Sequence, residues 1–298
     1  MNKIECFKIQ LFTIENEKTQ SILQIKNDRH TLFREPTIIV ADPFLFVHND
    51  ALFLFYEQKK LRHNGTIMMM RTADLEHWSK PVEVLREPFH LSYPWVFEKD
   101  GHIYMMPETC GDKSVRLYEA VDSELTEFRL VKKLIEQNKK EDLDFSFSDS
   151  SVVERDGKYY LFTTVRKGGV NQLRLFCSKE FMGQYHEHPK SPICVSNKYG
   201  RNAGHFTQYQ GALYRFAQDC ENGYGDNVHI LKVKKLSTDD YKEDVVKENI
   251  LNQNNAFYKF GGHQLNIVEF KGRTIIATDA KEYHRFLVNR VLKKVGFS

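Results

Sequence analysis

The chain has 298 residues, of which 41% are hydrophobic, 13% aromatic and 28% charged, and its formal net charge is +3. This charge is too small, and the basic residues are too scattered, for a nucleic-acid-binding surface, so nucleic acid is not an expected partner. No stretch approaches the roughly 20 apolar residues of a membrane span, and the first residues lack the apolar core of a signal peptide. We therefore expect no transmembrane segment, a cytoplasmic protein, and reduced thiols at its five cysteines.

Five hairpin units of similar design follow one another along the chain. Each begins with an apolar strand, turns at polar residues or glycine, and continues into a second strand; the units begin near residues 41, 92, 148, 202 and 262. A repeat of this length is typical of a propeller or a solenoid. Alignment of the five turns places one residue of each unit in register: Asp42, Tyr93, Asp149, Ala203 and Gln264.

Further strand-like runs follow the hairpins, for example at residues 67–70 and 82–85 in the first unit. Four strands per unit are typical of a propeller blade rather than of a solenoid coil. We therefore predict an all-β, five-bladed β-propeller with four-stranded antiparallel blades around a central funnel, formed by residues 1–298 as a single domain. The apolar alternation of residues 4–12 predicts a strand that completes the last blade and closes the ring.

A propeller of this kind would bring acidic residues of different blades to one funnel. Asp42 and Asp149 head inner strands, whereas the other acidic candidates end the strands that return to the same side. One protonated and one ionised carboxyl group form the pairing that cleaves a glycosidic bond. For Glu57 and Asp279, ion pairs to neighbouring basic side chains are the favoured interpretation. The predicted catalytic residues are Asp42, Glu108, Asp149 and Asp219.

Aromatic and basic side chains near the same end could hold a sugar or an anionic group. Trp95 is as compatible with the core as with a stacking platform. Arg215 lies within an apolar strand and so requires a carboxylate or an anionic ligand; a structural salt bridge stays open for it and for Arg201. His263 could hold a central water or ion, and no other cofactor or metal is expected. The predicted substrate-binding residues are Tyr93, Trp95, Arg201, His205, Arg215, Gln218, Tyr224 and His263.

Four motifs carry a resemblance to a known family: Ala41-Asp42-Pro43-Phe44, Ser92-Tyr93-Pro94, Arg201-Asn202-Ala203-Gly204 and Gln218-Asp219-Cys220. With their neighbours, over roughly residues 38–280, they resemble the propeller domain at the amino terminus of plant glucosamine inositolphosphorylceramide transferases and its bacterial relatives. The chain is more distantly similar to five-bladed glycoside hydrolases of families 43, 32 and 117. That similarity implies a base or nucleophile at Asp42 and a supporting role for Asp149.

The resemblance to the hydrolases is incomplete in the fourth unit. Their acid Glu has no match here, because Arg201-Asn202-Ala203-Gly204 stands in its place. Either Glu108 or Asp219 then donates the proton, or the site does not hydrolyse.

The residues and the resemblance together predict a carbohydrate-active enzyme of bacterial surface-polysaccharide metabolism. It would make or break a glycosidic bond, by transfer from an activated, phosphate-bearing donor or by hydrolysis. The expected partners are a sugar or nucleotide-sugar substrate, a glycan acceptor, and other glycan-synthesis enzymes. The alternative is a propeller that binds a sugar or nucleotide sugar without catalysis and assists a synthase; a protein-interaction propeller is the third class.

Overall fold

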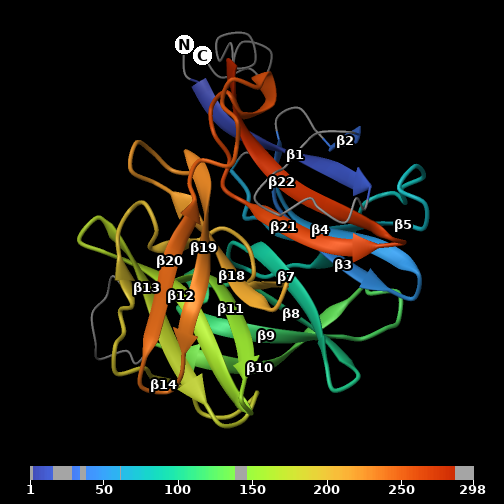
Figure 1. The fold of residues 1–298 in the computed structure, drawn as a ribbon. Coiled ribbons are helices and arrows are strands. Elements are labelled where there is room, and N and C mark those ends of the chain that lie inside the picture. Colours follow the sequence, from blue (N-terminus) through green and yellow to red (C-terminus); the bar gives the residue numbers. More distant parts are fainter. Residues whose placement is uncertain (1–2, 16–28, 34–37, 61, 138–145, 286–298) are drawn as a thin grey trace, which may run out of the picture.

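The computed structural model describes residues 3–15, 29–33, 38–60, 62–137 and 146–285. In these ranges the chain forms strands β1 to β22 and two short 3-10 helices, Cys110–Asp112 and Ala256–Tyr258. The strands make five antiparallel sheets that surround a common centre (Figure 1). The predicted all-β, five-bladed propeller is confirmed. No helix in the described ranges is long and apolar enough to cross a membrane.

The first three blades are meanders in chain order. The first blade contains β3 (Ile38–His48), β4 (Ala51–Lys60), β5 (Thr66–Thr72) and β6 (Val82–Leu85). The second contains β7 (Ser92–Lys99), β8 (His102–Glu108), β9 (Ser114–Ala120) and β10 (Phe128–Glu136). The third contains β11 (Phe147–Arg155), β12 (Lys158–Lys167), β13 (Val170–Ser178), β14 (His186–Glu187) and β15 (Cys194–Val195).

The fourth blade begins with an interrupted strand. It contains β16 (Arg201–Asn202), β17 (Thr207–Tyr209), β18 (Ala212–Asp219), β19 (Asn227–Leu236) and β20 (Tyr241–Lys247). The interruption includes Gly204, whose φ is +138° and at which a Cβ atom would lie 2.0 Å from the carbonyl oxygen of Leu265. Glycine therefore permits the fourth blade to approach the fifth closely at this point.

The fifth blade combines both ends of the described chain. It contains β21 (Leu265–Phe270), β22 (Arg273–Arg285), β1 (Lys3–Glu15) and β2 (Arg29–Phe33). β1 lies antiparallel beside β22 along its whole length (Figure 1). Ile9, Leu11 and Phe12 of β1 are buried in the clusters on either side of this blade. The arrangement leaves β22 with a partner on each side, as a closed ring requires.

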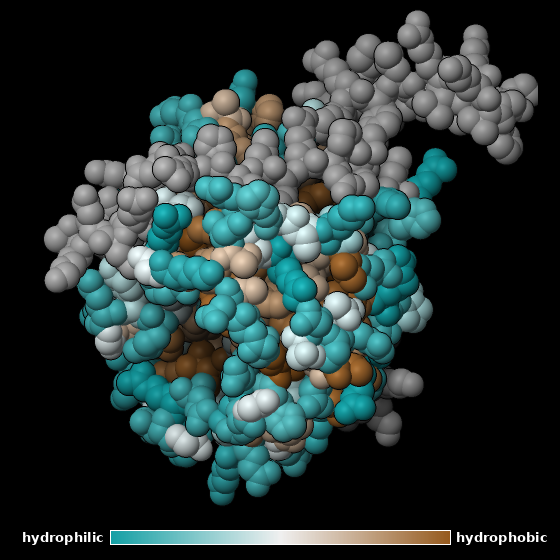
Figure 2. Space-filling model, turned by 90° about the vertical axis from the view of Figure 1, so that its right-hand side faces the viewer, coloured by the Kyte–Doolittle hydropathy of each residue, from teal (hydrophilic) through white to brown (hydrophobic). Residues whose placement is uncertain are grey.

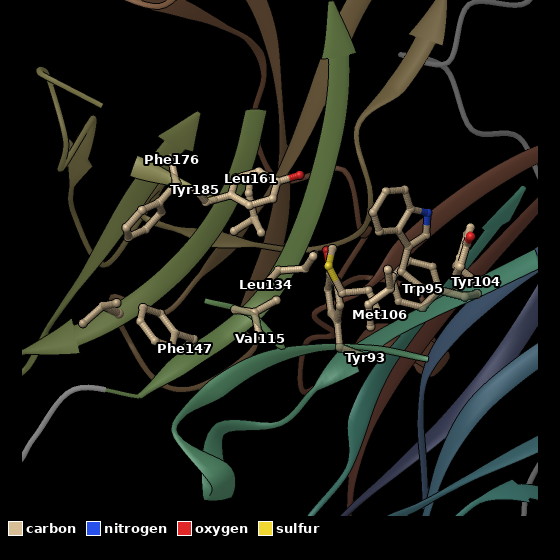
Figure 3. Packing of buried hydrophobic residues seen from close by; sticks show 13 residues of the cluster. Tyr93, Trp95, Tyr104, Met106, Val115, Leu134, Phe147, Leu161, Phe176 and Tyr185 are labelled. Atoms are coloured by element: carbon tan, nitrogen blue, oxygen red, sulfur yellow. The ribbon is translucent and has the colours of Figure 1, made fainter. Parts of the chain in front are cut away.

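The hydrophobic core lies between neighbouring blades. In the cluster between the second and third blades, Met106 and Val115 pack with Leu161 and Phe176 (Figure 3). On the face shown in Figure 2, hydrophilic side chains predominate and hydrophobic ones form patches between them. Aromatic and β-branched residues suit these interfaces because each strand presents one flat, half-buried surface to the next blade.

Three inner strands carry the same irregularity at the register positions that the repeat predicts. Strand pairing shifts across residues 41–44 of β3, 92–95 of β7 and 148–151 of β11. The residue with a left-handed backbone in each shift is Asp42 (φ 52°), Tyr93 (φ 49°) or Asp149 (φ 50°). Such bulges redirect a side chain, and they often lie beside functional sites. The positions that the sequence repeat aligns in these three blades therefore also share one backbone conformation.

Candidate functional site

Asp42 is a buried carboxylate that links three blades. Its Oδ1 lies 3.0 Å from Nε2 of His263, and its Oδ2 accepts a hydrogen bond from the backbone N–H of Tyr93 at 3.0 Å. The backbone N–H of Asp42 donates to Oδ2 of Asp279 at 3.2 Å. Burial opposes ionisation, but the positive His263 and these hydrogen bonds outweigh it and hold the pKa of Asp42 below its ordinary value. Asp42 is therefore ionised at neutral pH.

His263 lies between two carboxylates. Its Nδ1 is 2.9 Å from Oδ2 of Asp279. Asp279 is fully buried, and its Oδ1 accepts hydrogen bonds from the backbone N–H groups of His263 and Gln264. Burial alone would lower the pKa of His263, but the charges of Asp279 and Asp42 raise it well above its ordinary value. The result is a buried carboxylate–imidazolium–carboxylate chain that joins the fifth blade to the first.

The same three residues are the group with metal-ligand spacing in the described part of the chain. Candidate ligand atoms of Asp42, His263 and Asp279 all lie within 4.8 Å of one another. Each ring nitrogen of His263 lies within 3.0 Å of a carboxylate oxygen, so ion pairing holds the three side chains together without a cation. The central ion near His263 therefore stays a prediction, and the triad itself accounts for the geometry.

Glu57 places a second carboxyl group beside Asp42. It lies in β4 opposite Ala41, the residue before Asp42, and is 6% exposed. Its Oε1 is 3.5 Å from Nε2 of His90, whose own pKa is lowered by burial. Burial and the negative charge of Asp42 raise the pKa of Glu57 well above its ordinary value. The neighbouring carboxyl groups of Asp42 and Glu57 thus favour opposite protonation states.

Arg201 joins the carboxylates of the second and third blades. Its Nε donates to Oδ2 of Asp149 at 2.5 Å, and its terminal nitrogen lies 3.6 Å from Oε2 of Glu108. Burial raises the pKa of Asp149 to about 8, with Arg201 opposing the shift and the charges of Glu108 and Asp42 adding to it. Asp42 and Asp149 therefore share one electrostatic environment.

Tyr224 and Gln218 lie beside this group. Tyr224 is 41% exposed, and its ring centroid is 5.0 Å from the guanidinium of Arg201 and 5.1 Å from the ring of His263. Gln218 is buried, pairs with Arg201 across β16 and β18, and accepts a hydrogen bond from the thiol of Cys220 at 3.0 Å. Tyr224 is thus the accessible aromatic ring among the predicted substrate-binding residues.

Tyr93 and Trp95 are packed into the core, and His205 lies half-buried against Trp95. Tyr93 is 1% exposed, and Trp95 stacks on Phe97 at 4.2 Å and on His205 at 6.0 Å. Nδ1 of His205 lies 2.8 Å from Nδ2 of Asn266, and burial lowers the pKa of His205 to about 4. These three residues shape the interior, and a direct contact with substrate stays a prediction for each.

Two predicted site residues have ionisable partners within the protein. Oδ2 of Asp219 lies 3.1 Å from Nε2 of His229, and a catalytic role for Asp219 stays a prediction. Arg215 is fully buried in a structural salt bridge with Glu243, so its charge is met within the protein. Side chains alternate along a strand, so Arg215 and Asp219 share one face of β18 while Gln218 occupies the other.

The buried Arg215–Glu243 ion pair should be important for the stability of the protein. We expect Arg215→Met to lower the free energy of unfolding by about 3–5 kcal/mol, because it leaves a largely buried carboxylate without its partner. For a chain of this size the melting temperature should fall by roughly 10 °C in calorimetry. Lys190→Met, which removes an exposed ion pair with Asp240, is the control. Equal shifts in the two variants would show that the buried pair contributes no more than a surface pair.

Comparisons with known proteins place the chain in a family by sequence. The family model described as glucosamine inositolphosphorylceramide transferase 1, N-terminal, matches residues 25–279. A protein of that name from Oryza sativa subsp. japonica is 39% identical over 216 residues, which cover 70% of this chain and 28% of the relative. The Arabidopsis thaliana protein is 34% identical over 218 residues, which cover 70% of this chain and 27% of the relative. The chain thus spans less than a third of the length of these relatives.

Solved structures share the fold at low identity. An α-L-arabinofuranosidase of Clostridium thermocellum has a TM-score of 0.58 at 18% identity, covering 87% of this chain and 85% of the other. A family 117 glycoside hydrolase of Zobellia galactanivorans has a TM-score of 0.56 at 12% identity, covering 87% and 93%. The sequence match to the plant proteins confirms the predicted resemblance, and the chain belongs to the family of the glucosamine inositolphosphorylceramide transferase 1 amino-terminal domain.

Proposed function

We propose that this site makes or breaks a glycosidic bond, with Asp42 as the ionised carboxylate and Glu57 as the proton donor. The observation that carries the proposal is a pair of neighbouring carboxyl groups whose pKa values are displaced in opposite directions. Glycosidic chemistry needs this combination, because one carboxyl group protonates the leaving oxygen while the other attacks the sugar or activates the incoming nucleophile. In this proposal Glu57 takes the proton-donor role that the sequence predicted for Glu108 or Asp219.

The remaining charged residues would hold the substrate. Arg201 already pairs with Asp149 and Glu108, so it brings a positive charge to the site together with two carboxyl groups that can form hydrogen bonds with sugar hydroxyl groups. The plant relatives are named transferases and the structural neighbours are named hydrolases, and both reactions proceed at a glycosidic carbon. Transfer and hydrolysis are therefore the two reactions to assay.

A second function, sugar or nucleotide-sugar binding without catalysis, is favoured by one observation. Both oxygens of Asp42 already have partners within the protein, and the Asp149 carboxylate is held by Arg201. A carboxylate with partners on both oxygens is a weaker base than a free one, because those partners stabilise its charged form. In this case the propeller would present a glycan to a synthase.

Product analysis separates the two functions. The protein is incubated with nucleotide sugars and oligosaccharide acceptors, and in parallel with aryl glycosides and oligosaccharides in water. New glycoside or released sugar supports the proposed reaction. Thermal stabilisation by a sugar without any product over the whole panel would contradict catalysis and support the binding function.

Glu57→Gln tests the proton donor through pH. In the wild type we expect activity to fall as pH rises through the raised pKa of Glu57, because its donor proton is lost. In Glu57→Gln this fall of activity with rising pH should vanish, and activity on substrates with a poor leaving group should be about 10²- to 10⁴-fold lower than in the wild type. Glu98→Gln, at an exposed position of β7, is the matched control. An unchanged pH profile in Glu57→Gln would remove Glu57 from the reaction.

Glu57→Gln should also change how the free energy of unfolding depends on pH. Between the ordinary pKa of a glutamate, about 4.3, and its raised value in the folded protein, the folded state binds more protons than the unfolded state. Glu57 therefore makes the wild type lose stability as pH rises through this window. Glu57→Gln should lose less over the same window, as measured by chemical denaturation.

The proposal extends to the biological setting that the sequence resemblance implies. We propose a surface polysaccharide as the source of the substrate, other glycan-synthesis enzymes as partners, and the cytoplasm as the site of action. Cell fractionation, together with polysaccharide analysis of a strain lacking the protein, tests this extension. Unchanged polysaccharide composition in that strain would contradict it.

A further inference from the structure

Three exposed aromatic residues lie on neighbouring backbone segments beside the site. They are Tyr224 (41% exposed), Phe260 (45%) and Tyr283 (39%), and we call them the aromatic shelf. In the described ranges, the other exposed large hydrophobic residues are all valine or leucine. Exposed aromatic rings forgo a substantial burial free energy, so their gathering at one place indicates a binding surface.

The backbone segments that carry the three shelf residues are fastened together. Lys281 donates from its side chain to the carbonyl oxygen of Tyr224 and from its backbone to that of Gly261, the residue after Phe260. At Gly261 a Cβ atom would lie 2.4 Å from the carbonyl oxygen of Gly225, so the loop carrying Phe260 touches the loop carrying Tyr224. The rings of Phe260 and Tyr283 lie 5.2 Å apart at 81°.

The shelf begins at the charged site. Tyr224 contacts both Arg201 and His263, so its ring is the link between the carboxylate cluster and the two outer rings. Its hydrophobic neighbour Phe7, in β1, is buried and lies 4.7 Å from the ring of His263 and 6.4 Å from that of Tyr224. A molecule bound over Asp42 and Arg201 could therefore extend directly over the shelf.

The rim of the shelf is polar. Nζ of Lys259 lies 5.6 Å from the centre of the Phe260 ring, and Glu5 accepts a hydrogen bond from the Tyr283 hydroxyl at 3.4 Å. Lys281 lies 3.9 Å from Glu5. Aromatic faces surrounded by hydrogen-bonding groups match a sugar, which offers C–H groups on its ring face and hydroxyl groups at its edge. A purely apolar partner would leave these charges without water or partners.

We infer that the aromatic shelf is a subsite for the additional sugar rings of an extended glycan, next to the ring on which the reaction takes place. The inference rests on the proposed function, because it assigns one end of the glycan to the Asp42 site. It predicts that affinity rises with glycan length, and that the rise depends on Phe260 and Tyr283.

Isothermal titration with oligosaccharides of one to four rings tests the subsite. The probes are xylo-, gluco-, manno- and amino-sugar oligomers, and the proteins are the full chain, Phe260→Ala, Tyr283→Ala and their double variant. For a series that binds, the wild type should bind the three-ring oligomer at least roughly tenfold more tightly than the single ring. In the double variant this ratio should fall roughly three- to tenfold, as expected for lost stacking. Leu130→Ala, an exposed apolar position in the outer strand of the second blade, is the control and should keep the wild-type ratio.

The outcomes separate the subsite from the reaction. A length effect lost in the double variant, with no turnover in any assay, supports the shelf and contradicts the proposed function. Turnover with a length effect that Phe260→Ala/Tyr283→Ala leaves intact contradicts the shelf and leaves the proposed function standing. Absence of binding across the panel, or a concentration-dependent dimer that the double variant abolishes, would also overturn the shelf as a glycan subsite.

Discussion

Asp42→Asn should lower turnover by about 10³-fold or more while leaving the protein folded. The amide keeps an oxygen that can accept the backbone N–H of Tyr93, and asparagine is among the few residues that tolerate the left-handed φ of 52° at this position. What it loses is the negative charge. The pKa of Glu57 should also fall in this variant, because the charge of Asp42 is one cause of its elevation.

Asp156→Asn is the matched control for this substitution. Asp156 also has a left-handed backbone, with φ 52°, but its side chain is 87% exposed in a hairpin turn of the third blade. We expect normal turnover in the control and a melting temperature for Asp42→Asn within about 5 °C of the wild type, since one partner of His263 remains. Retention of more than a tenth of wild-type turnover by Asp42→Asn would exclude Asp42 from the mechanism.

Removal of residues 1–15 should have the largest effect on stability. It deletes the whole of β1, leaves the edge of β22 unpaired, and exposes the clusters that Ile9, Leu11 and Phe12 fill. Full burial of one such side chain contributes about 1.5–3 kcal/mol, so three approach the whole stability of an ordinary domain. We expect a fall in melting temperature of more than about 15 °C, or an insoluble protein.

A point substitution keeps this prediction measurable if the truncated chain does not fold. Phe12→Ala should lower the free energy of unfolding by about 3–5 kcal/mol, while Thr13→Ala, on the neighbouring and less buried position, should change it by less than about 1 kcal/mol. A synthetic peptide of residues 3–15 should restore part of the stability lost by truncation. A truncated protein that melts like the wild type would show that β1 does not close the ring.

The blade pattern could be predicted from the sequence because hairpins have recognisable turn residues and alternating apolar strands. Turn residues such as Asp156-Gly157 recur at a regular spacing, and apolar alternation marks the flanking strands. The same alignment placed Asp42 and Asp149 in register, and in the structure they have matching bulges and share one electrostatic environment. Periodicity fixed these positions even though the residues lie in different blades.

The side-chain partners of these residues were harder to predict from the sequence, because they depend on which face of a strand each side chain occupies. The alternation of β18 could have separated Asp219 and Arg215 from Gln218, since they differ by odd numbers of residues. Glu57 was already among the acidic candidates, and the hairpin register, which pairs it with Ala41, could have favoured it over the others. The pairing of His263 with Asp279 could be found only from the fold, because it depends on where the imidazole lies relative to the carboxylate that also accepts the backbone N–H of His263.

Carbon-13 NMR of the protein with labelled glutamate carboxyl groups reports the protonation state of Glu57 without an assay of turnover. The resonance that disappears in Glu57→Gln is assigned to Glu57 and followed as a function of pH. We expect this carboxyl group to be still protonated at pH values where the exposed glutamates have ionised, and we expect Asp42→Asn to lower its pKa toward theirs. A Glu57 resonance that titrates together with the exposed glutamates, or below them, would contradict the pairing of a protonated Glu57 with an ionised Asp42.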